Sequence, residues 1–241
     1  MFIADGHHRF EAAMKFRNEY KEKNARFAEE ESFNHVMMYF TPIEAPGLLI
    51  FPIYRLVKPI PNFDIHQFEE EIKSYFEVKL FPFTKRTETK VRKKMMGELE
   101  ALNDKHAYVL IAQGMPHYYL LTLKNEELSD SLQEEGRSQA YKRLDVSILH
   151  AVVMNKILNI TEQDQVNYTK NVDEAISSVN SGKYQMAFLL NATKVTDVLE
   201  IAGKGEKMPQ KSTYFYPKLI SGLVMNKIEI GEKIGGEKTS S

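Results

Sequence analysis

Hydrophobic and polar residues are arranged along this chain with two different periods, one typical of helices and one typical of strands. Helical spacing, or runs of strong helix formers, predict helices at residues 8–23, 64–76, 84–103, 144–158, 172–179 and 195–202. Asp64 stands where it would cap the second of these helices. Short, strongly apolar runs predict strands at 2–4, 33–40, 48–57 and 185–190, and a hairpin that pairs 107–112 with 118–123. The sequence therefore predicts an α+β fold in which mixed sheets carry flanking helices.

A polar, acidic link at residues 124–137 divides the predicted elements into two groups. We expect one mixed α/β part at residues 1–124 and a second α/β part at residues 138–230. The polar composition of residues 231–241 predicts a disordered tail.

The charge balance and the absence of cysteine exclude several classes of function. The 32 basic and 33 acidic side chains give a net charge of −1, so DNA is not an expected partner, since non-specific nucleic-acid binding needs a basic footprint. With no cysteine, disulfides, zinc–thiolate sites and thiol catalysis are excluded. No apolar run reaches the roughly 18 residues of a membrane span, and no signal peptide precedes the first motif. We therefore expect a cytoplasmic protein without membrane contact, and the sequence leaves homo-oligomerisation open.

Polar residues gather at the beginning of the chain, at a predicted strand-to-helix corner. This histidine corner consists of Asp5, Gly6, His7, His8 and Arg9. The unpaired N–H groups of the first helical turn favour an anion, and the histidines and the arginine add further donors. The pattern predicts binding of a phosphate or a carboxylate. The alternative is that Asp5 caps the helix and that both histidines are ordinary surface residues.

A second polar cluster lies on the glycine-bearing loop 203–213 and just beyond it. The residues that offer positive charge or hydroxyl donors to a phosphate are Lys211, Ser212, Thr213 and Lys218. The loop is not a Walker A motif, because Gln210 stands where a glycine is required and the following sequence is extended. Solvated charge is the alternative interpretation. If both clusters serve one site, residues 207–218 fold against the histidine corner, with Lys211 within about 15 Å of His8.

Three stretches of the sequence resemble signatures of one protein family. They are residues 3–13, 144–150 and 208–224. Together they are similar to the domain-of-unknown-function family DUF 1015, some of whose members are labelled SpoOJ- or ParB-type regulators. Members of that family have a long N-terminal half before the histidine motif. The resemblance therefore implies that this chain corresponds to the C-terminal part of the family only and that the N-terminal half is missing.

The histidine corner is also similar to the glycine-to-arginine box of the ParB and sulfiredoxin superfamily, whose members bind a nucleotide phosphate at this turn. Sulfiredoxin chemistry is excluded because it needs a cysteine, and residues 5–9 are closer to the free-serine kinases of the same superfamily. The resemblance implies a strand-loop-helix phosphate corner and phosphoryl transfer. Asp5 would hold magnesium or orient a hydroxyl, His7 or His8 would move a proton, and Gly6 and Arg9 would bind phosphate.

Three functions remain open from the sequence. The first is a kinase-like phosphotransferase or phosphohydrolase acting on a small hydroxyl metabolite, with a nucleotide (ATP, ADP or CTP) and magnesium as cofactors and a small phosphorylated ligand as partner. The second is a ParB- or SpoOJ-type nucleotide-binding regulatory protein. The third is an interaction module whose motif is structural. Retention of a nucleotide separates the third from the others, and turnover with a hydroxyl acceptor separates the first from the second.

Overall fold

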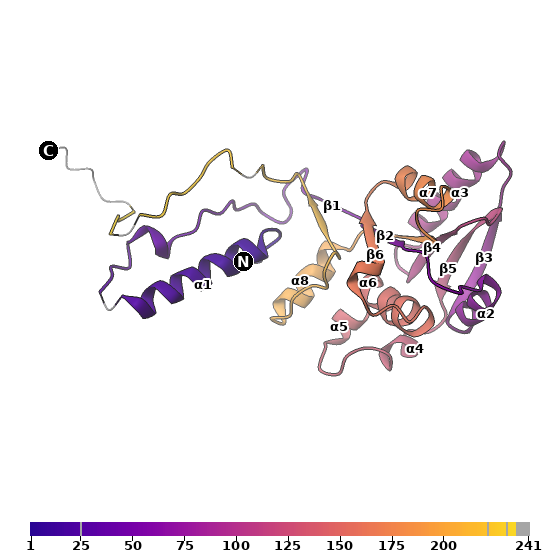
Figure 1. The fold of residues 1–241 in the computed structure, drawn as a ribbon, viewed down its shortest axis with the longest axis horizontal. Coiled ribbons are helices and arrows are strands. Elements are labelled where there is room, and N and C mark those ends of the chain that lie inside the picture. Colours follow the sequence, from indigo (N-terminus) through magenta and orange to yellow (C-terminus); the bar gives the residue numbers. More distant parts are fainter. Residues whose placement is uncertain (25, 221, 230, 235–241) are drawn as a thin grey trace. The chain divides into compact units, whose positions relative to one another are not determined.

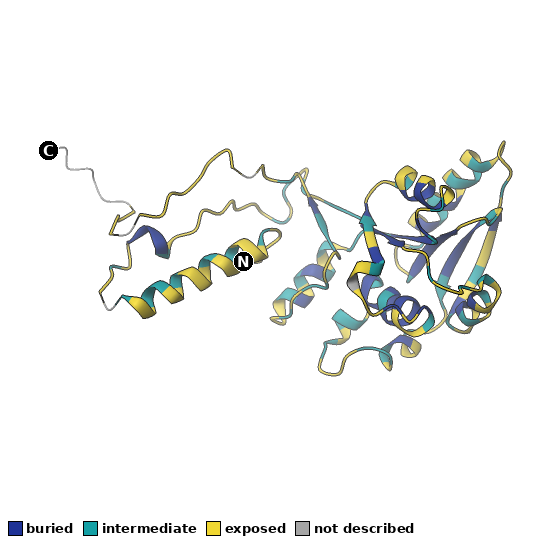
Figure 2. Ribbon diagram, viewed as in Figure 1, coloured by how far each residue is buried: buried dark blue, intermediate teal, exposed yellow. Residues whose placement is uncertain are grey.

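The computed structural model describes residues 1–24, 26–220, 222–229 and 231–234. The chain divides into two compact units. The first comprises Met1–Leu49 and Phe215–Ser241, and the second comprises Ile50–Tyr214. Buried residues are concentrated in the second unit, whereas exposed residues dominate the first (Figure 2).

The second unit is built on a six-stranded sheet (Figure 1). In spatial order the strands are β3 (Phe76–Pro82), β5 (His117–Leu123), β4 (Ala107–Ala112), β7 (Met186–Leu190), β2 (Tyr54–Val57) and β6 (Val166–Thr169). All neighbouring strands in it are antiparallel; Leu110, for example, lies opposite Phe188. The α+β class is as expected, but the expected mixed sheet is wrong, because the hairpin and the helical crossovers all return the chain antiparallel to its neighbour. Two further short strands, β1 (Leu49–Phe51) and β8 (Tyr214–Tyr216), pair with each other.

Helices cover both faces of the six-stranded sheet. The longer ones are α2 (Ile65–Tyr75), α3 (Glu88–Ala101), α7 (Val172–Asn180) and the helix formed by α6 (Asp145–Ile148) and η2 (Leu149–Ile157). Helix α8 (Val195–Gly203) instead packs against α5 (Gln139–Lys142). Figure 1 shows α3 and α7 on one side of the sheet and α2 and α6 on the other. Every residue of β4 and β7 is buried, as expected for strands that are covered on both faces. Short helical turns complete the unit: α4 (Glu127–Asp130), α5 (Gln139–Lys142) and η3 (Gln163–Gln165).

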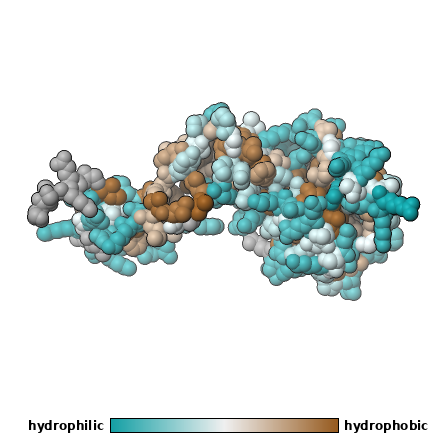
Figure 3. All heavy atoms as spheres, turned by 90° about the horizontal axis from the view of Figure 1, so that it is seen from above, coloured by the Kyte–Doolittle hydropathy of each residue, from teal (hydrophilic) through white to brown (hydrophobic). Residues whose placement is uncertain are grey.

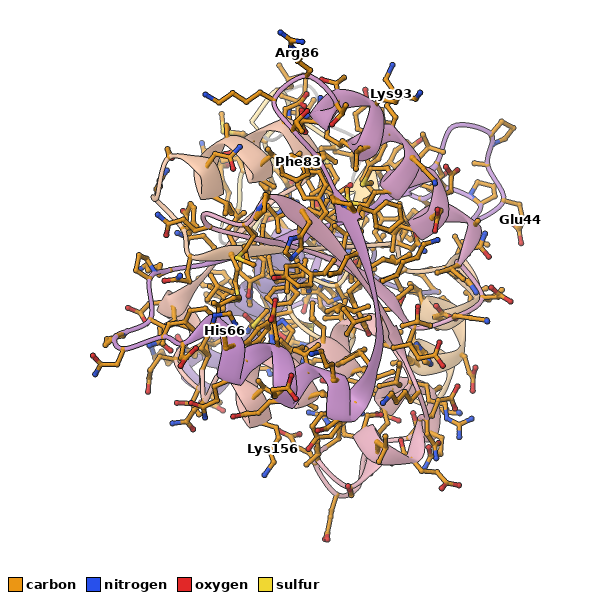
Figure 4. The ribbon with its side chains drawn as sticks, turned by 90° about the vertical axis from the view of Figure 1, so that its right-hand side faces the viewer. Glu44, His66, Phe83, Arg86, Lys93 and Lys156 are labelled. Carbon is orange, nitrogen blue, oxygen red and sulfur yellow. The ribbon has the colours of Figure 1, made fainter. Side chains whose placement is uncertain are left out.

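Elements with a strong local signal lie close to where the sequence predicts them. Asp64 caps α2, and its Oδ1 accepts a hydrogen bond from the backbone N–H of His66 at 2.8 Å. The predicted hairpin is β4 with β5. The helix predicted at 84–103 is α3, and Arg86 just before it and Lys93 within it point outward (Figure 4). The aromatic ring of Phe83 instead packs on Tyr118, with 4.5 Å between ring centroids.

The predictions miss two strands of the six-stranded sheet and one break within a predicted strand. Strand β3 follows α2 with no intervening loop, so the helical period hides its beginning at Phe76. Strand β6 is a four-residue edge strand with few apolar positions. The single strand predicted at 48–57 is two strands, because Pro52 has no N–H to donate to a ladder.

The predicted helix at 144–158 changes its winding along its length. It begins as α6 and continues as η2, which has π-helical hydrogen bonding. The backbone N–H of Leu158, for example, donates to the carbonyl of Val153 at 2.9 Å. Wider turns of this kind are frequent at functional sites, and His150 lies on this one.

The first unit is formed by α1 (His7–Lys23), the short helix η1 (Ser32–Asn34) and extended segments. Phe33 is buried against Tyr20, with 4.4 Å between ring centroids. The strands predicted at 2–4 and 33–40 are wrong: residues 2–4 are irregular, and 35–40 pair with no strand in the part of the chain that the structure describes. Apolar runs of this kind become strands only when a partner strand satisfies their backbone groups.

The tail predicted to be disordered begins with an ordered contact. Lys233 forms an isolated β-bridge with Glu31, and the N–H of Ser32 donates to the carbonyl of Glu232 at 2.8 Å. Residues 235–241 lie outside the described residues.

Large apolar side chains are exposed on the extended segments of the first unit. They include Val36, Met37, Met38, Tyr39, Phe40, Leu219, Ile220, Leu223, Val224 and Met225. Figure 3 shows hydrophobic patches that interrupt a mainly hydrophilic surface. None of the described helices is both long and apolar enough to cross a membrane.

Candidate functional site

The histidine corner is the beginning of helix α1. Gly6 is the N-cap residue, and its φ of 82° lies in the left-handed region that favours glycine. A Cβ atom at this position would lie 3.0 Å from Nη2 and 3.1 Å from Nε of Arg9, so the guanidinium lies close to the Gly6 backbone. The N–H of Phe10 makes the first backbone bond of this turn, to the carbonyl of Gly6 at 3.0 Å. The expected strand-loop-helix corner is therefore a loop followed by a helix.

Asp5 forms an ion pair with Lys218, and both residues belong to the first unit. The distance between Asp5 Oδ2 and Lys218 Nζ is 3.1 Å. Partial burial opposes ionisation of Asp5, but the hydrogen bond and charge of Lys218, the N–H of Gly6 and the charge of Arg9 together hold its pKa below the ordinary value. Asp5 is thus a carboxylate at neutral pH. The contact also joins the first polar cluster to one residue of the second.

Both histidines of the corner are accessible. His7 and His8 are exposed, and Nδ1 of His8 lies 3.4 Å from a carboxylate oxygen of Glu11 one turn along the helix. Asp5 is not the helix cap, because the N-cap is Gly6 and no side chain caps this end of α1 among the described residues. The corner therefore presents its polar groups at the protein surface.

The remaining residues of the second cluster belong to the second unit. Lys211 has a φ of 55°, a left-handed conformation that is uncommon for a residue with a side chain. Its carbonyl accepts a hydrogen bond from Nη2 of Arg55 at 2.8 Å, and the carbonyl of Ser212 accepts one from Thr193 Oγ1 at 2.8 Å. Ser212 is buried, and Thr213 is half-buried. Because Lys211 and His8 lie in different units, their expected proximity stays a prediction.

A buried arginine and a histidine, which sequence reasoning missed, lie behind this loop. Arg55 on β2 is completely buried, and besides Lys211 it donates to the carbonyl of Ile53 and, at 3.4 Å, to Nε2 of His150. Burial lowers the pKa of Arg55 to about 10, partly offset by two tyrosines. Burial and the charge of Arg55 lower the pKa of His150 to about 4, so His150 is a neutral acceptor at pH 7. An arginine inside the apolar run 53–57 is the signal that could have found this pair.

A second network of charged residues surrounds His106, just before β4. Nδ1 of His106 lies 2.7 Å from Asp145, and Nε2 lies 3.3 Å from Glu126, which Arg143 also contacts at 2.8 Å. Burial opposes protonation of His106, but the hydrogen bonds and charges of Asp145 and Glu126 raise its pKa above the ordinary value. Asp145, in the first turn of α6, thus also holds a histidine.

Magnesium at the histidine corner would have Asp5 as its protein ligand. No group of three or more metal-ligating side chains occurs among the described residues. Magnesium is commonly held by only one or two carboxylates, with phosphate oxygens and water completing the shell. Asp5 fits that requirement as a hard oxygen donor, and magnesium stays a prediction.

Two surface hollows lie elsewhere on the second unit. One, of about 140 Å³, is lined by Phe63 and Gln67 among others, and another, of about 150 Å³, by Leu80 and Tyr119 among others. Neither is lined by a residue of the histidine corner or of the loop at 211–213. The residues that carry candidate chemistry are therefore not those that line these hollows.

Comparison with solved structures finds similar proteins at low sequence identity. A conserved hypothetical protein from Pyrococcus furiosus is 18% identical with a TM-score of 0.41, over 88% of this chain and 68% of that chain. A free serine kinase in complex with AMP is 17% identical with a TM-score of 0.41, over 88% and 66%. A mutant free serine kinase in complex with ADP is 14% identical with a TM-score of 0.41, over the same shares. This chain thus spans about two thirds of the length of these proteins.

Comparison with protein families gives a match to the beginning and middle of the chain. No curated protein matches it. A family model described as protein of unknown function (DUF1015) matches residues 1–147. The matched region contains the histidine corner and reaches into the signature at 144–150, while the signature at 208–224 lies outside it. Because these residues make up more than half of the sequence, the chain belongs to the DUF1015 family of proteins of unknown function.

Proposed function

We propose that the histidine corner binds the phosphate of a nucleotide or of a small phosphate ester. The observation that carries this proposal is the ion pair of Asp5 with Lys218 beside the beginning of α1. Lys218 and Arg9 bring two positive charges to a helix end whose N–H groups and dipole also favour an anion. Asp5 contributes one negative charge, so these three residues keep an excess of positive charge. That excess suits a phosphate.

For the reaction, we infer either phosphoryl transfer to the hydroxyl group of a small metabolite or hydrolysis of the phosphate ester of such a metabolite. The carboxylate of Asp5 is ionised, and it can accept the proton of a hydroxyl group or hold magnesium. His7 and His8 are accessible, and an imidazole side chain can serve as a general acid or base. Arg9 and Lys218 can neutralise charge on a transferring phosphoryl group.

A nucleotide-binding regulator of the ParB or SpoOJ type would use the same binding step without turnover. An interaction module is favoured by a different observation, which is the set of exposed apolar side chains on residues 36–40 and 219–225. The binding titration and the turnover assay described below distinguish an enzyme from both alternatives.

Calorimetric titration of the 241-residue protein tests the binding step. The ligands are AMP, ADP, ATP, CTP, phosphoserine and inorganic phosphate, each with and without magnesium. Arg9→Ala should weaken binding roughly 10- to 100-fold, because a charge-assisted hydrogen bond contributes about 1.5–3 kcal/mol. Lys204→Ala is the matched control, since Lys204 forms an exposed pair with Glu200 at 2.8 Å on α8. No binding by the wild type, or equal losses in the two variants, would contradict the proposal.

Turnover tests the reaction. The protein is incubated with magnesium and the nucleotide that binds most tightly, in the presence of serine, glycerol or another small hydroxyl compound. Acceptor-dependent phosphate transfer, lost in Asp5→Asn, supports the enzyme. Tight nucleotide binding without any turnover supports the regulator.

A further inference from the structure

Arg55 carries a positive charge into the interior of the second unit without a negative partner. It is completely buried on β2, and no carboxylate lies within 4 Å of its guanidinium among the described residues. Its hydrogen-bond acceptors are all neutral: the carbonyls of Ile53 and Lys211 and Nε2 of His150. Its guanidinium also lies 5.7 Å from the ring centroid of Tyr168.

Such an arrangement needs a reason beyond packing. Burying an unpaired charge is costly, and an apolar side chain of similar volume would fill the same space. What an apolar side chain could not supply is a donor to a carbonyl on a distant loop. Arg55 has a planar group with several donors in fixed directions, which suits it to hold that carbonyl in place.

The loop that Arg55 holds is constrained at two successive residues. The carbonyl of Lys211 is fixed by Arg55, and the carbonyl of Ser212 is fixed by Thr193. Lys211 is held in the left-handed region, which costs conformational energy and so requires support from its surroundings. The two anchors therefore set the direction of both side chains.

Ser212 is the residue whose hydrogen bonding is incomplete. It is 4% exposed, and its hydroxyl oxygen has no hydrogen-bond partner within the described part of the chain. A buried hydroxyl without a partner is unusual, because it loses its hydrogen bonds to water and gains none. Beside it, the side chain of Lys211 is exposed.

We propose that Ser212 and Lys211 form a phosphate-contacting element, and that Arg55 is the positioning residue that holds this element through the carbonyl of Lys211. This inference goes beyond the proposed function, because it concerns a separate phosphate contact that lies wholly within the second unit. The hydroxyl of Ser212 donates to a phosphate oxygen, and the ammonium group of Lys211 supplies charge. His150 keeps the guanidinium of Arg55 oriented by accepting from its Nε–H.

The test compares Arg55→Met, Arg55→Lys and Ser212→Ala with a control arginine, Arg92→Met. Arg92 lies on α3 in the same unit and pairs with Glu88 and Asp173. Each variant is titrated with inorganic phosphate and AMP, and its thermal midpoint is measured. The backbone ¹⁵N chemical shift of Ser212 responds to the hydrogen bond that Arg55 donates to the carbonyl of Lys211. This shift is measured by NMR in the presence and absence of phosphate.

Arg55→Met and Ser212→Ala should each weaken phosphate binding about five- to tenfold, and the double variant should bind no more weakly than Arg55→Met alone. Arg55→Lys should restore part of the affinity, and Arg92→Met should leave it unchanged. Phosphate should shift the Ser212 resonance in the wild type and in Arg92→Met, and a given phosphate concentration should shift it less in Arg55→Met. If folded Arg55→Met or Arg55→Lys binds phosphate as the wild type does while Arg9→Ala does not, the inference fails and the proposed function stands. If the wild type binds no phosphate or nucleotide, both fail.

Discussion

Asp5 and Lys218 are partners: the carboxylate oxygen Oδ2 of Asp5 lies 3.1 Å from the ammonium nitrogen of Lys218. The contact joins the histidine corner to a residue near the opposite end of the chain within one compact unit. It also sets the charge of the corner, because it keeps Asp5 ionised while Arg9 stays close to the Gly6 backbone.

Removing Lys218 should raise the pKa of Asp5. In the wild type, NMR titration of the Asp5 carboxyl should give a midpoint below its ordinary value of 3.8. In Lys218→Met the opposing effect of burial remains and the largest favourable contribution is lost, so the midpoint should move upward. Lys227→Met, at an exposed lysine of the same unit, is the control. An unchanged Asp5 midpoint in Lys218→Met would show that the ion pair is absent in solution.

The sign of the resulting pH dependence follows from the lowered pKa. Because the folded value lies below the unfolded one, the stabilisation by the Asp5–Lys218 pair is present above pH 3.8 and is lost as the pH falls through the folded value. The decrease in the free energy of unfolding on acidification should therefore be smaller in Lys218→Met than in the wild type, as measured by urea unfolding.

His150 should make the second unit less stable in acid. Its folded pKa of about 4 lies below the ordinary value of 6.5, so between these values the unfolded chain binds a proton that the folded protein does not. The free energy of unfolding should therefore decrease as the pH falls from 6.5 to 4, by up to about 3 kcal/mol. Urea unfolding of the wild type and of His150→Gln across this range measures the effect as a difference in slope. Parallel curves would mean that His150 is not buried beside Arg55.

His106 should make the second unit less stable as the pH rises above neutral, which is the opposite of the effect of His150. Its folded pKa is raised above 6.5 by Asp145 and Glu126, so its stabilisation is complete below 6.5 and is lost as the pH rises through the folded value. The charged groups that face this network are Glu126, Arg143, Asp145 and, through Asp145, Asp197. Urea unfolding from pH 6 to 9 should show decreasing stability in the wild type and a flatter profile in His106→Gln. An assigned His106 resonance with a titration midpoint at or below 6.5 would rule out this role.

The parts of the fold that the sequence predicts are those with a local cause. Asp64 marks the beginning of α2 because its side chain caps the helix. The hairpin of β4 and β5 follows from a short turn between two apolar runs. The strand predicted at 33–40 fails because strand formation depends on a partner elsewhere in the chain, and β3 is hidden because it continues directly from α2. Local sequence contains neither cause.

The candidate site divides in the same way. The helix at the histidine corner is recognisable from Gly6 and the helix formers that follow it. The contact of Asp5 with Lys218, and that of Arg55 with His150 and Lys211, join residues far apart in the sequence. The buried arginine could be noticed in its apolar run, but its partners could not be inferred without the fold. The expected cytoplasmic location and the domain limits at 124 and 138 stay predictions, and homo-oligomerisation stays open.

Gly6→Ala should damage both the stability of the first unit and its binding of phosphate. With φ at 82°, an alanine at this position is strained, and its Cβ would also lie 3.0 Å from Nη2 of Arg9. Gly205→Ala is the matched control, because Gly205 has a similar φ of 75° but no atom within 4 Å of the position that a Cβ atom would take. The strain alone should lower the free energy of unfolding by roughly 1–2 kcal/mol in either variant. Only Gly6→Ala should also weaken phosphate binding, because the new methyl group displaces the guanidinium of Arg9 from the helix end. Thermal unfolding and calorimetric titration of the two variants separate these effects, and equal phosphate affinity in both would show that the position of Arg9 over Gly6 does not matter for binding.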